Sequence, residues 1–138
     1  LEQIAQEAGL ERGMEKAEIT RRLDPYRERL LAFVYTRVVE RCRAAGVLPI
    51  WLLLPEPTEA EGTAERNQVV RRLAEQAGFQ ILDLSDVYAG QSLPTLWVAD
   101  WDHHPNAKGH LLITQALLRA MRADPTIRAA MKLETNDP

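Results

Sequence analysis

The sequence predicts an α/β fold built on a parallel sheet. Two short apolar runs, Val47–Leu54 and Phe79–Leu84, have the length and composition of strands. The first run shows no alternation of apolar and polar residues, which is typical of a parallel strand covered on both faces. Helical patterns with short connections precede and separate the two runs. This order of helix, strand, helix and strand favours the α/β class.

Composition indicates a globular protein of one domain. The 138 residues are 46% apolar and 27% charged, and the formal net charge is −3. Basic residues are scattered along the chain, so no nucleic-acid-binding face is predicted. The longest apolar run is far shorter than the roughly 20 residues of a membrane-spanning helix, so no spanning segment is expected. The single cysteine, Cys42, excludes an internal disulfide.

The part of the chain before the first strand is predicted to be helical. Leu1–Gly13 is weakly amphipathic and interrupted by glycine, so residues 1–24 are expected to form an N-terminal arm or short helix. A long helix is predicted over Pro25–Ala45, where apolar residues recur at helical spacing. Asp24 can cap its start, proline is tolerated in its first turn, and Gly46 follows as a C-terminal cap.

Helices are also predicted after the first strand and at the end of the chain. Thr63–Gly78 carries its apolar residues on one side, whereas Ser85–Ala99 is expected to be a helical turn and loop. Asn106 can cap a further helix that runs to about Ala123. The expected organisation is an N-terminal arm at residues 1–24, an α/β domain at residues 25–123, and a short helix with a polar tail at residues 124–138.

The chemically distinctive stretch is Asp100–His110, which contains all three histidines of the chain. Pro105 favours an extended conformation at His104, which would present the imidazole outward before the following helix. Asp102 is near enough along the backbone to hold one nitrogen of that ring and leave the other free as a general base. In an extended segment His103 would point the opposite way, toward solvent.

The run from Asp102 to His110, Asp-x-His-Pro-Asn-x-x-Gly-His, resembles the last motif block of the SGNH (GDSL-like) hydrolases. This resemblance implies a flavodoxin-like three-layer α/β/α fold, of which the chain would form the C-terminal portion. It also implies an ester hydrolase with a Ser-His-Asp triad, in which His104 is the base and Asp102 its partner. The family usually places the acid three residues before the histidine, where Trp101 stands here. Asp102 lies two residues before His104, and Asp100, four residues before it, is the alternative acid. The other motif positions are Pro105, Asn106, Gly109 and His110.

The rest of that family pattern does not occur in the sequence. There is no Gly-Asp-Ser block and no Gly-x-Asn-Asp block, and the only serines, Ser85 and Ser92, lie outside the position of the family nucleophile. We therefore expect the N-terminal half with the nucleophile to have been removed, lost or supplied by another chain. The intact enzyme would act on small acyl esters of a carbohydrate or lipid, and no cofactor is implied. Exposed strand edges and apolar faces predict a homo-oligomer or association with an N-terminal half.

Two other functions fit the same stretch. One is a non-catalytic structural or interaction domain of the same fold, which dimerises through its sheet. The other is a metal-binding module, although zinc needs three or four ligands in a tetrahedron and the spacing contains no helical His-x-x-x-His pair. The oxygen and imidazole ligands of that module would be Asp100, Asp102, His103, His104 and His110. Glu56 follows the first strand, at the position where open α/β sheets bind ligands. The alternative interpretation is an exposed acidic residue of the loop.

Overall fold

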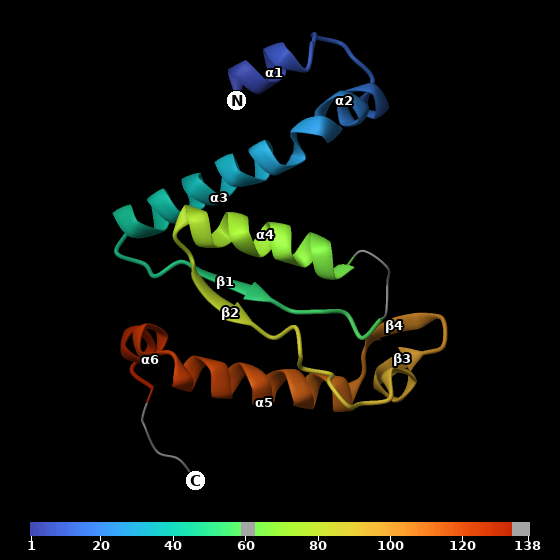
Figure 1. Ribbon diagram of the computed structural model, residues 1–138, viewed down its shortest axis with the longest axis vertical. Helices are drawn as coiled ribbons and strands as arrows, with labels where there is room; N and C mark the ends of the chain where they lie inside the picture. Colours follow the sequence, from blue (N-terminus) through green and yellow to red (C-terminus); the bar gives the residue numbers. More distant parts are fainter. Residues whose placement is uncertain (59–62, 134–138) are drawn as a thin grey trace.

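The chain alternates helices with short strands, as predicted, in a computed structural model that describes residues 1–58 and 63–133 (Figure 1). Most of the expected C-terminal tail falls outside these ranges. The elements are α1 (Glu2–Glu7), α2 (Lys16–Leu23), the 3₁₀ turn η1 (Asp24–Tyr26), α3 (Arg27–Ala44), β1 (Ile50–Leu53), α4 (Thr63–Ala77), β2 (Gln80–Asp83), the 3₁₀ turn η2 (Leu93–Leu96), β3 (Trp97–Ala99), β4 (Asp102–Pro105), α5 (Ala107–Ala123) and α6 (Pro125–Met131).

The predicted parallel pair is formed by β1 and β2. Ile50 lies opposite Gln80 at one end of the pair, and Leu53 lies opposite Asp83 at the other. Helix α4 contacts both strands and packs on α3, whereas α5 contacts β2 from the other side of the pair (Figure 1). The described residues thus form a mixed α/β fold with a small parallel sheet of two strands.

The prediction that the first strand is covered on both faces is wrong. Ile50 is 36% exposed and Leu52 is 39% exposed, whereas the alternate residues Trp51 and Leu53 are half-buried. Trp51 lies on the covered face, where its Nε1 donates to the Tyr35 hydroxyl of α3 at 2.9 Å. The apolar composition of a strand does not show whether other elements pack against both of its faces. We call Ile50 and Leu52 the open face of β1.

Helix α3 ends where the sequence predicts. Gly46 has a φ of +68°, a left-handed conformation that glycine adopts without strain. This turn lets the backbone amide of Val47 donate to the carbonyl of Cys42 at 2.8 Å, which satisfies one of the last carbonyls of the helix. The chain then leaves the helix directly toward β1.

Residues 1–24 contain a second short helix, α2, that the sequence pattern did not reveal. The α2 segment is strongly charged, with Ala17, Ile19 and Leu23 as its apolar residues, and none of its residues is fully buried. Glu18 accepts hydrogen bonds from Arg21 and Arg22, one turn further along, and such pairs modestly stabilise a helix. Helix α2 runs through η1 into α3 without a loop, so no linker separates residues 1–24 from the rest.

An antiparallel hairpin replaces the loop that was expected before the helix at Asn106. Its strands β3 and β4 pair Trp97 with Pro105 and Ala99 with Asp102, with an irregularity between them. The hairpin is not hydrogen-bonded to the parallel pair in the described structure. It therefore forms a separate support for the histidine-rich stretch.

A small hydrophobic core anchors this hairpin to α5. Leu96, at the end of η2, is fully buried, and it packs with Tyr88 and Ile113. Burial also raises the pKa of the Tyr88 hydroxyl. In the described part of the chain, no helix combines the length and apolarity that crossing a bilayer requires.

Candidate active site

The histidine-rich stretch folds as strand β4 followed by the first turn of α5. His104 lies in β4, in the extended conformation that the following Pro105 favours. Asn106 then caps α5, as predicted. The motif therefore places the His104 imidazole at the junction between strand β4 and helix α5, and both elements are regular secondary structure.

The Asn106 side chain joins the hairpin to the helix. Its Oδ1 accepts hydrogen bonds from the backbone amides of Lys108 at 3.0 Å and Gly109 at 3.2 Å. Its Nδ2 donates to the carbonyls of Thr95 at 3.0 Å and Trp97 at 2.9 Å. One amide group therefore caps α5 and also binds the segment that leads into β3.

Gly109 is required by close packing rather than by backbone conformation. A Cβ atom at this position would lie 2.8 Å from the Cβ of Pro105 and 3.4 Å from the carbonyl oxygen of Leu96. Glycine thus allows the first turn of α5 to approach the end of β4 closely. The remaining motif residue, His110, is exposed on α5, and its side chain does not line the recess around His104.

His104 and Asp102 form a hydrogen-bonded pair. His104 Nδ1 lies 2.6 Å from Asp102 Oδ1, which also accepts from the backbone amide of His104 at 3.1 Å. Because a carboxylate can only accept, Nδ1 carries the proton and Nε2 is the basic nitrogen. The His104 side chain is 82% exposed, and Nε2 bonds to no other described residue, so it is open to an incoming group.

The structure brings Asp102, and not Asp100, to His104. Asp100 lies in the turn between β3 and β4, and its backbone carbonyl accepts a hydrogen bond from His103 Nε2 at 3.1 Å. His103 is exposed to solvent, as expected, and it lines the same recess as His104. The His103 ring stacks on Trp97 with centroids 4.1 Å apart, across the short and irregular hairpin.

The pair shifts the pKa of each member. The hydrogen bond and charge of Asp102 raise the pKa of His104, and the charge of Glu56 raises it further. The same hydrogen bond from His104 lowers the pKa of Asp102. Asp102 thereby stabilises the imidazolium, which is the form that a general base reaches after it takes a proton.

Asp102→Asn is expected to lower the pKa of His104 toward its ordinary value of 6.5, as measured by following the ring signals in an NMR titration. Asp100→Asn, the matched control, should leave the raised value unchanged because its carboxylate does not bond to the ring. A fall in the control and not in the Asp102 variant would assign the partner to Asp100.

The pair also predicts a pH window for stability. Because the pKa of His104 is raised, its contribution is fully present below 6.5 and is lost as pH rises through the raised value. Because the pKa of Asp102 is lowered, its contribution is present above 3.8 and is lost as pH falls through the lowered value. The difference in unfolding free energy between the wild type and Asp102→Asn should therefore be largest between these two values.

The recess beside the pair is small and acidic. It has a volume of about 170 Å³ and is lined by Glu56, Trp101, Asp102, His103 and His104. Ligand pockets usually measure roughly 300–1,000 Å³, so this recess can form only part of a substrate site. Its lining contains no serine, threonine or cysteine among the described residues. The part of the chain that the structure describes also contains no cluster of three or more metal-binding side chains, which leaves the metal alternative without geometric support.

Comparison with protein-family models, with curated proteins and with solved structures gives no match for this chain.

Proposed function

We propose that this chain supplies the base and acid of an acyl-ester hydrolase of the SGNH type, and that the nucleophilic serine comes from a segment outside residues 1–138. The observation that carries this proposal is the Asp102–His104 pair, with Nε2 of His104 basic and open. A histidine oriented by a carboxylate is the general-base half of a serine triad.

The chemistry follows from the tautomer of His104. Its Nε2 takes the proton of the serine hydroxyl as the serine oxygen attacks the ester carbonyl. Asp102 stabilises the imidazolium, which returns that proton to the leaving alcohol as the carbon–oxygen bond breaks. An acyl-enzyme remains, and Nε2 then deprotonates the water that hydrolyses it to an acid and free serine.

The open face of β1 supports a larger assembly. In the described structure β1 pairs only with β2, so its outer edge has unpaired backbone groups, and Ile50 and Leu52 are exposed. We propose that another chain segment pairs with this edge and completes a flavodoxin-like three-layer α/β/α domain. That arrangement would bring new residues toward the carboxyl ends of the strands, where such folds hold their sites.

Association through β1 can be tested by substitution. Residues 1–138 are expected to self-associate in light scattering, because bare strand edges and apolar faces attract partners. Leu52→Lys should reduce the associated fraction. The matched control is Leu118→Lys on α5, because Leu118 is 43% exposed and Leu52 is 39% exposed. A clean monomer in the wild type would contradict this prediction.

The proposed activity is tested with a fluorophosphonate probe, which labels activated serines. The tagged chain, purified with its natural partners, should carry a labelled serine on a residue outside 1–138. His104→Ala should abolish labelling, whereas His110→Ala should not, because that side chain does not line the recess. Absence of any labelled serine in an assembly that hydrolyses esters would exclude the serine mechanism.

The isolated chain is expected to have no esterase activity, because its recess lacks a nucleophile among the described residues. The assay is turnover of p-nitrophenyl acetate by protein of verified mass. Turnover that disappears in His104→Ala would show that the nucleophile lies within the chain.

The exposed Ile50 and Leu52 also favour a second function, a non-catalytic domain that dimerises through β1. Such a domain would associate normally when His104 is replaced by alanine, and no labelled serine would accompany it. The labelling experiment therefore separates the two functions.

A further inference from the structure

Trp97 joins two parts of the chain that lie 40 residues apart in the sequence. Its indole Nε1 donates to the backbone carbonyl of Pro57 at 2.7 Å, in the loop that follows β1. The face of its ring stacks on His103 of β4, with centroids 4.1 Å apart and the ring planes at 27°. One side chain therefore holds the loop after β1 against the hairpin that carries His104.

Both segments that Trp97 joins are held by further contacts. Pro57 is fully buried, and the backbone amide of Thr58 donates to the carbonyl of Glu56 at 2.8 Å, which closes a turn in the loop. On the hairpin side, the backbone carbonyl of Trp97 accepts from the Asn106 amide at 2.9 Å. The indole therefore fixes the position of the loop relative to the hairpin.

The loop held by Trp97 carries Glu56 to the recess of His104. Glu56 and His104 both line that recess, whereas Trp97 does not. A carboxylate near an imidazole favours the protonated form of the ring. Glu56 is therefore placed to act on the base directly, and Trp97 acts on it only through the loop.

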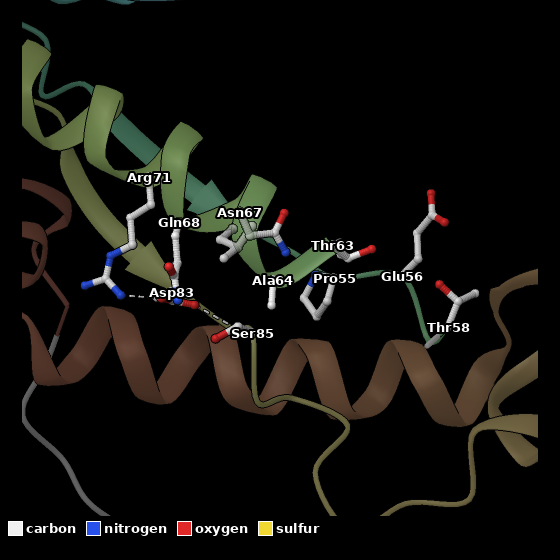
Figure 2. A pocket seen from close by; sticks show the side chains of 11 residues that line it. Pro55, Glu56, Thr58, Thr63, Ala64, Asn67, Gln68, Arg71, Asp83 and Ser85 are labelled. Atoms are coloured by element: carbon white, nitrogen blue, oxygen red, sulfur yellow. Dashed lines mark hydrogen bonds and ion pairs between the residues drawn. The ribbon is translucent and has the colours of Figure 1, made fainter. Parts of the chain in front are cut away.

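The cations near the loop leave the charge of Glu56 unmatched. In Figure 2, Glu56 lies apart from the ion pair of Arg71 and Asp83. The Arg71 guanidinium donates to Asp83 at 2.7 Å and to Glu75 at 2.9 Å. Arg66 lines a neighbouring hollow together with Glu56. Glu56 nevertheless takes part in none of the ion pairs between the described residues.

The remaining charged groups near His104 in the sequence lie on the hairpin and on α5. Asp102 is bonded to the ring, whereas Asp100 contacts the hairpin through its backbone carbonyl. Lys108 Nζ donates to a threonine hydroxyl of η2 at 3.3 Å. The lining of the recess contains no lysine or arginine among the described residues, so no cation there offsets Glu56.

We propose that Trp97 is a positioning residue for the base. It holds the loop of Glu56 against the hairpin, so that Glu56 acts as a second carboxylate beside His104 and favours the imidazolium that forms when Nε2 takes a proton. The role in ester hydrolysis rests on the proposed function, whereas the coupling between Trp97, Glu56 and His104 does not.

The charge of Glu56 is tested first, by NMR titration of the His104 ring in residues 1–138. Glu56→Gln should lower the pKa of His104, and by less than Asp102→Asn, which also removes a direct hydrogen bond. The effect should shrink between low salt and about 1 M salt, where the Debye length falls to about 3 Å. The matched control is Glu65→Gln, because Glu65 is exposed on α4 and does not line the recess.

Trp97→Phe tests the link itself, because it removes the indole donor and keeps an aromatic ring for the stack. Glu56→Gln should then lower the pKa of His104 less than it does in the wild-type background, since the loop is no longer held. Asp102→Asn should retain its full effect, because that pair lies within β4. In the control background Trp101→Phe, where the replaced indole is 86% exposed, Glu56→Gln should keep its wild-type effect.

Hydrogen exchange tests the same bond without a substitution, so its result does not depend on whether Trp97→Phe folds. The indole N–H of Trp97 should exchange with solvent at least about fivefold more slowly than that of Trp101, the effect of one neutral hydrogen bond. Only the first of these two groups donates to a described residue.

Four results would overturn the proposal. They are an unchanged pKa of His104 in Glu56→Gln, an undiminished effect of Glu56→Gln in the Trp97→Phe background, equal exchange of the Trp97 and Trp101 indole protons, and loss of the Asp102→Asn effect in Trp97→Phe. The last result would show that Trp97 only supports the fold of the hairpin.

The link to hydrolysis is tested separately in the proposed assembly. There Glu56→Gln should lower kcat by roughly 1.5- to fivefold, the size expected of one exposed charge pair. Absence of any labelled serine would remove this link and leave the charge coupling in residues 1–138 in place. Failure of the NMR experiments would remove the coupling and leave the serine-labelling result unaffected.

Discussion

In the proposed assembly with a serine-bearing segment, His104→Ala is expected to lower kcat/KM for ester hydrolysis by about a hundred- to ten-thousand-fold. The variant removes the only imidazole that is hydrogen-bonded to a carboxylate in the described structure. Serine oxygen is a weak nucleophile until a base takes its proton, so the loss should appear mainly in kcat. Steady-state kinetics on p-nitrophenyl esters measure the effect.

Two further variants show whether the loss of activity in His104→Ala comes from lost base catalysis or from disruption of the fold. Asp102→Asn should also lower kcat, because the asparagine amide removes the carboxylate that fixes the tautomer and stabilises the imidazolium. His110→Ala should retain wild-type kinetics, because His110 lies on α5 outside the recess. Equal losses in His104→Ala and His110→Ala would point to disruption of the fold and not to base catalysis.

Asn106→Ala is expected to lower the unfolding free energy by about 2–4 kcal/mol, from the loss of a helix cap and two side-chain hydrogen bonds. The asparagine bonds to the amides of Lys108 and Gly109 and to the carbonyls of Thr95 and Trp97. Alanine leaves all of these groups without this partner at the junction of β4 and α5. Denaturant unfolding followed by tryptophan fluorescence measures the change.

Asn106→Ser separates the two roles of the side chain. Serine can still cap α5 through its oxygen, but it cannot donate to both Thr95 and Trp97. An intermediate loss of stability is therefore expected. A serine variant as stable as the wild type would show that the bonds into the hairpin contribute nothing, and that Asn106 acts only as a cap.

Much of the fold could be predicted because single residues determine local geometry. Gly46 marks the end of α3 and Asn106 marks the start of α5, and both depend only on neighbouring backbone atoms. The apolar composition of Val47–Leu54 and Phe79–Leu84 was enough to predict the parallel pair. The pairing of Asp102 with His104 was also local, because the two residues are separated by one position.

The features that could not be predicted depend on distant residues or on weak patterns. Trp97–Ala99 is too short to show a strand pattern, and Pro105 argues against a strand at β4. Glu56 reaches the recess beside His104 only through the tertiary fold. The exposure of Leu52 depends on what covers β1, which the composition of the strand does not report.

The hairpin of β3 and β4, which Asn106 joins to α5, has a consequence for the order of events in folding. The side-chain hydrogen bonds that join Asp102 to His104, and Asn106 to its partners, lie within the short segment Thr95–Gly109. Such sequence-local loops close at little entropic cost, and hairpins of this kind form in roughly 1–10 μs. We therefore expect the Asp102–His104 pair to form before the proposed partner segment binds. In the proposed assembly, the concentration of the nucleophile-bearing segment would set the rate at which active sites appear.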